Sequence, residues 1–371
     1  MDLTVGEHDT PTDPAILDVM DQAARAGATR YAAVPGIDAL RDAVAERVQA
    51  QSGVATAREN VLIVPGGQAG LFAAHLCALD AGDVGLIVDP YYATYPGTLR
   101  AAGGHVRTVT ARAVDGFQLR GDDVVSAAEA APQARSLLVN SPNNPTGAVY
   151  TRRTLEGIAD ACRETDLWLV SDEVYDGQVW DGAHVSPRAL PGMAERTLVV
   201  GSMSKSYAMT GSRLGWVVGP SAAIAAMADL ATHTTYGVPG FIQEAARWAL
   251  TEGDTLADRV AAPFRRRRRL VVAAFAGHPF LRVAPMQGGM YAFVDIRATG
   301  MSGSAFAEVL LAEARIAVMP GESFGQAGAG HIRIAMTAED DAFGAALSAV
   351  VAVAERLAIG ASETGAAELG R

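Results

Sequence analysis

The stretch that decides the fold reads Thr197-Leu198-Val199-Val200-Gly201-Ser202-Met203-Ser204-Lys205. It begins as a continuous apolar run and ends in small polar residues and a lysine. A run without polar alternation is typical of a strand that is buried on both faces of a parallel sheet. Six further runs of this kind occupy residues 61–65, 85–89, 105–110, 136–140, 167–171 and 213–219. The pattern predicts an α/β fold with a mostly parallel seven-stranded sheet and helices on both faces.

The segments around these runs predict the helices and a second domain. Helical patterns at residues 70–79, 95–102 and 154–165 alternate with the predicted strands. Beyond residue 255 the pattern changes to helices at 256–275, 304–313 and 339–357 and glycine-rich, hairpin-like pieces at 286–295, 316–320 and 331–336. We therefore expect a large domain at residues 35–255 and a smaller α+β domain formed by residues 1–34 and 256–371.

Composition excludes several classes of protein. The formal net charge of −11 argues against a general nucleic-acid binder, which needs a cationic surface. The only two cysteines, Cys77 and Cys162, form neither a disulfide framework nor a metal-binding spacing, so we expect no metal and a reducing compartment. The N-terminus does not resemble a signal peptide, and no stretch approaches the roughly 20 apolar residues of a membrane span. We expect a cytoplasmic protein.

Polar residues follow the predicted strands at their carboxyl ends, where open α/β sheets bind ligands. The first strand ends in Pro65-Gly66-Gly67-Gln68, a sequence that lets backbone amides approach a phosphate at a helix N-terminus. Tyr92 follows the second strand and could stack on a flat heterocycle. Asn143 and Asn144 follow another strand and supply amide donors. A plain turn or rim packing accounts for each of these patterns when it is taken alone.

Two strand ends carry ionisable residues. Asp172 directly follows an apolar run, and a buried carboxylate needs a cationic partner such as a protonated pyridine nitrogen. A helix N-cap is the alternative reading of Asp172. Lys205 also follows an apolar run, where poor solvation favours the neutral amine that adds to an aldehyde. Ser202, Ser204 and Arg213 around it are suitable donors for a phosphate dianion. The combination indicates a phosphorylated, aldehyde-bearing, pyridine-like cofactor.

These residues resemble the signature of the fold-type I, class I and II aminotransferases, which use pyridoxal 5′-phosphate. The resemblance covers about residues 5–357 and rests on Asn143-Asn144-Pro145-Thr146-Gly147, Ser171-Asp172-Glu173-Val174-Tyr175, Ser202-Met203-Ser204-Lys205, Ala208-Met209-Thr210-Gly211 and Arg213. Residues 168–219 are similar to bacterial arginine–pyruvate transaminases, and bacterial aspartate aminotransferases are the next relatives. The resemblance implies a homodimer that moves an amino group from an L-amino acid to a 2-oxo acid by a ping-pong mechanism.

The resemblance also implies a role for each site residue. Lys205 bonds covalently to the cofactor and moves the proton, while Asp172 keeps the ring nitrogen protonated. Tyr175 and Asn144 bind the phenolic oxygen of the ring, and Tyr92 stacks on the ring face. The phosphate is held by Gly67, Gln68, Ser202, Ser204 and Arg213, together with Tyr31 from the other subunit. Arg333 grips the substrate α-carboxylate, near Gly6 and Asn144.

The sequence departs from the family pattern at two places, and two other functions remain as alternatives. Family members usually carry a longer segment before Gly6-Glu7, and the Asp-Phe that often follows the family's Gly-Glu-Pro is replaced here, where the chain reads Gly6-Glu7-His8-Asp9-Thr10. We therefore expect an altered N-terminal arm. Gln68 stands where some aspartate-specific relatives carry a lysine, which weakens the case for an acidic substrate. A β-lyase or decarboxylase on the same scaffold shares the first chemical step. A regulator that only senses the cofactor would carry a DNA-binding module, and we expect none before Gly6.

Overall fold

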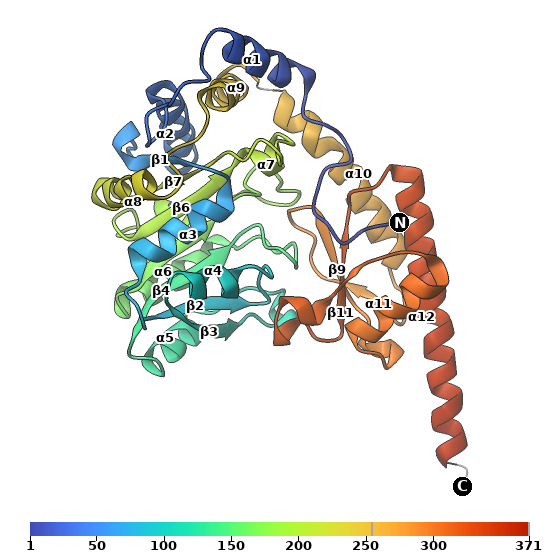
Figure 1. Cartoon of the computed structure of the whole chain (residues 1–371). Coiled ribbons are helices and arrows are strands. Elements are labelled where there is room, and N and C mark those ends of the chain that lie inside the picture. Colours follow the sequence, from blue (N-terminus) through green and yellow to red (C-terminus); the bar gives the residue numbers. More distant parts are fainter. Residues whose placement is uncertain (254, 370–371) are drawn as a thin grey trace.

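The computed structural model describes residues 1–253 and 255–369 and contains two sheets (Figure 1). The larger sheet has the strand order β1-β7-β6-β5-β4-β2-β3. Its strands are β1 (Val61–Val64), β2 (Val84–Asp89), β3 (His105–Thr110), β4 (Ala134–Asn140), β5 (Trp168–Asp172), β6 (Thr197–Ser202) and β7 (Gly215–Val218). Only β7 runs antiparallel to its neighbours β1 and β6. The predicted mostly parallel, seven-stranded sheet is therefore confirmed.

Helices cover both faces of this sheet, which explains the continuous apolar runs. The helices of this part are α1 (Pro14–Arg25), α2 (Asp38–Ser52), α3 (Gly67–Ala78), α4 (Tyr95–Ala101), α5 (Gly121–Glu129), α6 (Arg152–Glu164), α7 (Met203–Ser206), α8 (Ser221–His233) and α9 (Gly240–Thr251). Leu138 and Val170 pack in the core that includes Leu71 of α3. Their neighbours Leu137 and Leu169 point the other way, into the core built with α6. Both side-chain directions are buried, so neither can be polar.

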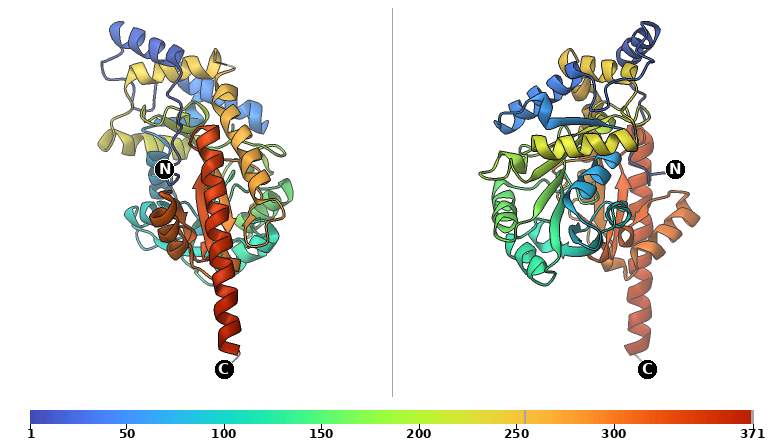
Figure 2. Two further views of the ribbon diagram at one scale, coloured as in Figure 1. Left: turned by 90° about the vertical axis from the view of Figure 1, so that its right-hand side faces the viewer. Right: turned by 60° about the vertical axis from the view of Figure 1, so that its left-hand side comes forward.

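The second sheet lies C-terminal to the first along the chain. It has the order β10-β11-β9-β8 and consists of β8 (Arg282–Val283), β9 (Tyr291–Asp295), β10 (Met319–Pro320) and β11 (His331–Ala335). The helices α10 (Leu256–Phe275), α11 (Gly303–Ala314) and α12 (Asp340–Leu369) accompany it. Phe306 of α11, Phe343 of α12 and Ile334 of β11 share one buried core. The end of α12 projects beyond the rest of the chain (Figure 2).

The N-terminal segment joins the two parts of the molecule. Leu3 is fully buried against the second sheet, where its N–H donates to Ala317 and its carbonyl accepts from Ala335, both at 2.9 Å. Farther along the chain, α1 packs against α9 beside the large sheet (Figure 1). The domain boundaries at residues 34/35 and 255/256 stay a prediction. No described helix is long and apolar enough to cross a membrane.

Several strand boundaries differ from the prediction by one or two residues, and two of these shifts have a clear local reason. Strand β5 includes Asp172, because Asp172 still pairs in register with Val200 of β6. Strand β7 begins at Gly215 and not at residue 213, because Arg213 has a φ of 50°, outside the β region. These shifts place Asp172 and Arg213 at the same end of the sheet.

Candidate active site

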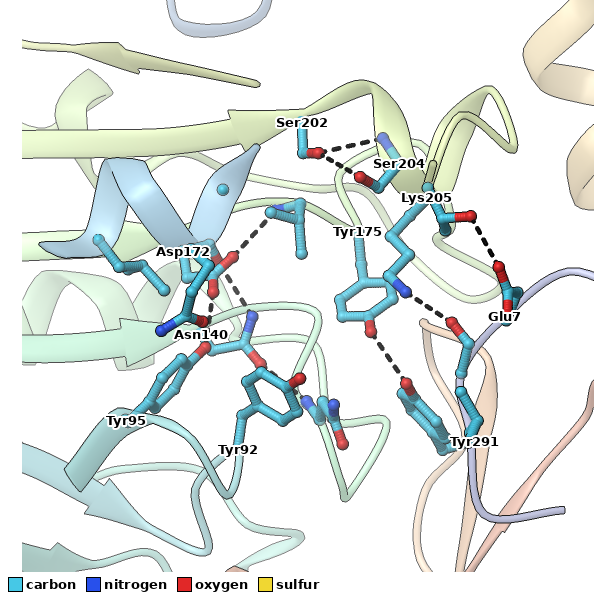
Figure 3. Close-up of a pocket in the computed structure, with 18 of the residues that line it drawn as sticks. Glu7, Tyr92, Tyr95, Asn140, Asp172, Tyr175, Ser202, Ser204, Lys205 and Tyr291 are labelled. Carbon is cyan, nitrogen blue, oxygen red and sulfur yellow. Dashed lines mark hydrogen bonds between the residues drawn. The ribbon is translucent and has the colours of Figure 1, made fainter. Parts of the chain in front are cut away.

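A cavity of about 470 Å³ opens at the carboxyl ends of the parallel strands, within the size range of small-molecule sites. Its wall comes from both sheets and from the N-terminal segment. Every predicted site residue except Tyr31 lines it: Gly6, Gly67, Gln68, Tyr92, Asn144, Asp172, Tyr175, Ser202, Ser204, Lys205, Arg213 and Arg333. Figure 3 shows many of these side chains converging on one space.

Lys205 reaches into the cavity from α7, a single turn that follows β6. Ser202 caps this turn, since its Oγ accepts from the N–H of Ser204 at 3.0 Å. Lys205 is half-buried, and its Nζ donates to the Gly6 carbonyl at 2.6 Å. The amine is therefore held at the boundary between the large sheet and the N-terminal segment (Figure 3).

Asp172 provides a buried negative charge on the opposite side of the cavity from the N-terminal segment. Its Oδ2 accepts from the Tyr95 hydroxyl at 2.7 Å, and its Oδ1 accepts from the Val174 N–H at 3.2 Å. Burial raises the pKa of Asp172 to about 6, although these hydrogen bonds act in the opposite direction. A protonated pyridine nitrogen would be a fitting cationic partner for this carboxylate.

The donor set for a phosphate lies between β1, β6 and β7. Gly67 begins α3, whose first amides are free to bind an anion. The hydroxyls of Ser202 and Ser204 are 2.9 Å apart. The exposed Arg213 packs so closely on Gly66 that an added Cβ there would lie 2.3 Å from its Nη2. Cationic, hydroxyl and amide donors thus meet at one spot, as a phosphate dianion requires.

The ring-binding candidates occupy the middle of the cavity. Burial raises the pKa of Tyr175 well above its ordinary value, and its hydroxyl donates to that of Tyr291 at 3.2 Å. Tyr92 presents a ring that packs edge to face on Tyr95, with centroids 5.6 Å apart. A neutral phenol, an amide from Asn144 and an aromatic face suit a flat, polar heterocycle. Together with the phosphate donors and Asp172, they fit pyridoxal phosphate.

Arg333 comes from β11 and closes the opposite wall. Its Nη1 donates to Asn144 Oδ1 at 2.9 Å, and its Nη2 donates to the Thr4 carbonyl. Its guanidinium lies 4.2 Å from the ring centroid of Tyr291 and 4.7 Å from that of Phe324. The buried Nε has no hydrogen-bond partner among the residues that the structure describes. This arrangement is a preorganised fork for a carboxylate.

Two predicted residues have surroundings of a different kind. Gln68 lines the cavity, but its side-chain amide is hydrogen-bonded to residues at the start of α4. Its Nε2 donates to Thr98 Oγ1, and its Oε1 accepts from Thr94 Oγ1 at 3.1 Å. Tyr31 is 90% exposed and packs edge to face on Tyr236, outside the cavity of its own chain.

The motif reading missed several wall residues. Tyr95, Asn140, Tyr291 and Thr4 line the cavity, and Tyr95 contacts Asp172 directly. Asn140 was only the end of a predicted strand, although its side chain accepts from Asn144 N–H at 2.8 Å. A polar residue at a strand end was the available signal for Asn140. No local signal marks Tyr291, because its role depends on the contact between the two sheets.

Comparison with known proteins agrees with this geometry. The family model for aminotransferases of class I and II matches residues 1–349. The chain is 43% identical to the arginine–pyruvate transaminase AruH of Pseudomonas aeruginosa, over 90% of this chain and 84% of that one. It is 35% identical to the aspartate/prephenate aminotransferase of Thermus thermophilus, over 91% and 87% of the two chains.

Solved structures show the same fold. An aromatic aminotransferase from Pyrococcus horikoshii superimposes with a TM-score of 0.92 at 34% identity, over 96% of this chain and 95% of that one. An aspartate aminotransferase from Thermus thermophilus with maleate gives a TM-score of 0.89, also at 34% identity, over 95% and 91%. The chain belongs to the class I and II aminotransferases, and it is a pyridoxal-phosphate-dependent enzyme that transfers amino groups.

Proposed function

We propose that this aminotransferase takes the amino group from a cationic L-amino acid, arginine foremost, and passes it to pyruvate, with Lys205 as the catalytic amine. The observation that carries the assignment of the site is that Lys205, Asp172 and Arg333 open onto one cavity although they belong to three different strands or turns. Support for the substrates comes from the similarity to the transaminase named for arginine and pyruvate.

The cofactor fits the donor set described above. When bound, pyridoxal phosphate supplies an aldehyde that bonds to amines and a ring that accepts electrons from the substrate α-carbon. Gly67, Ser202, Ser204 and Arg213 would hold its phosphate, joined by Gln68, and Asp172 would pair with its ring nitrogen. Tyr175 and Asn144 would bind its phenolic oxygen, and Tyr92 would stack on its ring.

Residues of the chain would transfer the proton, stabilise the charge on the ring and orient the substrate. Lys205 Nζ would act as base and then as acid: it would take the proton from the substrate α-carbon and deliver it to the carbon of the cofactor's aldehyde group, a 1,3 shift. Asp172 keeps a negative charge where the ring carries a positive one, and Tyr95 holds this carboxylate by its hydrogen bond. Arg333 binds the α-carboxylate and so orients the α-hydrogen toward Lys205.

The charges of the wall favour a cationic side chain over an acidic one. Asp172, Lys205, Arg213 and Arg333 all have roles in this scheme. Among the described lining residues, the remaining charged group is Glu7, whose carboxylate accepts from Thr210 Oγ1 at 3.0 Å. Gln68 is neutral. A guanidinium entering this cavity therefore meets a carboxylate that no cation already pairs among the described residues.

The test is a single half-reaction. Arginine, lysine, aspartate and phenylalanine are each mixed with the enzyme without a 2-oxo acid, and loss of the visible absorbance of the bound cofactor is followed. Arginine is expected to react fastest, and Lys205→Ala is expected to lose both the absorbance band and turnover. Fast reaction with aspartate alone would contradict the substrate, and turnover by Lys205→Ala would contradict the site. Release of pyruvate and ammonia from a β-substituted amino acid would indicate a β-lyase.

The proposed active form is a homodimer in the cytoplasm, with Tyr31 reaching the phosphate of the partner subunit. The supporting observation is that Tyr31 and Tyr236 form an exposed aromatic pair outside the cavity of their own chain. The two free cysteines suit a reducing compartment. Tyr31→Phe should weaken cofactor binding without changing the mass in sedimentation, and a monomeric, fully active enzyme would refute the arrangement.

A further inference from the structure

We propose that Asp89, the last residue of β2, is a positioning residue for substrate binding, because it holds Phe324 against the guanidinium of Arg333. The inference rests on the proposed role of Arg333 as the carboxylate-binding residue. Asp89 itself does not line the cavity. It acts through the segment of residues 324–327, which follows β10 and precedes β11.

Asp89 is a buried carboxylate whose hydrogen bonds go to this segment. It is 4% exposed, its Oδ2 accepts from the Gln326 N–H at 3.0 Å, and its Oδ1 accepts from the Ala327 N–H at 3.1 Å. Burial raises the pKa of Asp89, and the two amides act in the opposite direction. Over the described ranges, no arginine, lysine or histidine forms an ion pair with it. The two backbone amides therefore provide the compensation that a buried carboxylate requires.

Two further contacts fasten the same segment to the end of β2. The Tyr91 N–H donates to the Phe324 carbonyl at 2.9 Å. Gly325 has a φ of 109°, and a Cβ added there would lie 2.2 Å from Asp89 Oδ1. The backbone of residues 324–327 thus lies directly on residues 89–91, with no room for a side chain between them.

Phe324 transmits this position to the binding fork. Its ring is buried and its centroid lies 4.7 Å from the guanidinium carbon of Arg333. Tyr291 covers the guanidinium from a centroid distance of 4.2 Å. A planar cation that contacts two aromatic rings is restrained in orientation, and the direction of its fork depends on that orientation. The position of Phe324 therefore sets where a carboxylate can be bound by two parallel hydrogen bonds.

This arrangement predicts a selective defect. Lys205 lies on α7 and Asp172 ends β5, and the hydrogen bonds of segment 324–327 given above go to residues 89–91 and not to these elements. Loss of the Asp89 hydrogen bonds should therefore weaken the binding of carboxylate groups and leave the chemical step intact. The amino acid and the 2-oxo acid both carry the carboxylate that Arg333 binds, so both should be affected.

The experiment compares Asp89→Ala and Asp89→Asn with the wild-type holoenzyme. We expect KM to rise about tenfold for both substrates in Asp89→Ala, and less in Asp89→Asn, whose amide oxygen still accepts one hydrogen bond. We expect kcat to stay within about twofold, and the affinity for the cofactor and its absorbance to be unchanged. The control is Asp83→Asn, at the other end of β2, where Oδ2 accepts from the Asp80 N–H at 2.9 Å and KM should not change.

A second variant tests the inference independently of whether Asp89→Ala folds. Phe324→Leu removes the ring but leaves the Asp89 hydrogen bonds in place, and it should raise KM in the same way. The KM of the double variant Asp89→Ala/Phe324→Leu should then be no higher than the higher of the two single-variant values. The inference would be overturned by unchanged KM values. It would also be overturned if the rise in KM came with equally large falls in kcat and in cofactor affinity. Arg333→Gln tests the role of Arg333 separately from that of Asp89: if it leaves KM unchanged, the proposed role of Arg333 itself is wrong.

Discussion

The hydroxyl of Tyr95 donates a 2.7 Å hydrogen bond to Oδ2 of Asp172, and both residues are buried in the cavity wall at the end of the large sheet. Tyr95 begins α4 and Asp172 ends β5, so the bond joins two elements that are distant in sequence. It tunes the charge of a carboxylate whose ionised form the proposed mechanism requires.

Removing this hydroxyl should change the pH dependence of the reaction. The hydrogen bond lowers the pKa of Asp172, so Tyr95→Phe should raise it further above about 6. Less of the carboxylate is then ionised at a given pH, and the acidic limb of the kcat/KM profile should move to higher pH by about one unit. Tyr150→Phe, a buried tyrosine away from the cavity, is the control. An unmoved acidic limb in Tyr95→Phe would show that Asp172 does not govern it.

Asp172→Asn should stabilise the protein when the cofactor has been removed. The folded-state pKa of about 6 exceeds the ordinary 3.8, so the wild-type protein loses stability as pH rises from about 4 through 6. The amide of the variant is not ionised, so it avoids the cost of a buried charge. At pH 7 the variant should therefore gain about 1–3 kcal/mol in free energy of unfolding. At pH 4 the gain should vanish. Urea unfolding at both values measures it, and a variant less stable than wild type at pH 7 would contradict the burial argument.

Gly66→Ala should weaken cofactor binding through the phosphate donors. The added Cβ would displace Arg213, since it would lie 2.3 Å from Nη2, and Gly66 also has a φ of 83°. We expect the Kd for the cofactor to rise at least about tenfold, which corresponds to about 1.4 kcal/mol. Gly82→Ala shares the strain, with a φ of 92°, but its added Cβ would have no atom of the described residues within 4 Å. Both should lose stability, and equal cofactor affinity in the two variants would exclude a special role for Gly66.

Arg267→Ala should destabilise the attachment of the N-terminal segment. The buried Arg267 binds both oxygens of Asp9, at 2.9 and 2.6 Å, and Oδ1 of Asp340 at 2.9 Å. Its removal leaves two carboxylates without this partner, and we expect a loss of about 2–3 kcal/mol in free energy of unfolding. The neighbouring Arg266 pairs with Asp340 from an exposed position, so Arg266→Ala should cost less than about 1 kcal/mol. Equal losses in urea unfolding would contradict the importance of burial.

Much of the fold and the site follows from local patterns. The seven strands of the large sheet and helix α4 occur where apolar runs and their punctuation predict them. The carboxyl ends of parallel strands meet at one edge, and this rule is enough to bring Asp172, Asn144 and Lys205 together. Hydrophobic period and turn residues are properties of a few consecutive residues, so they can be read from the chain directly.

The sequence by itself thus determined the sheet, the strand-end residues and the class of cofactor. Tertiary structure alone decided the partners: Tyr95 for Asp172, the Gly6 carbonyl for Lys205, and Phe324 and Tyr291 for Arg333. Each of these contacts joins segments from different elements, and each depends on how the helices, the second sheet and the N-terminal segment pack. No local pattern encodes such a contact, because its energy comes from packing between surfaces that meet only in the folded chain.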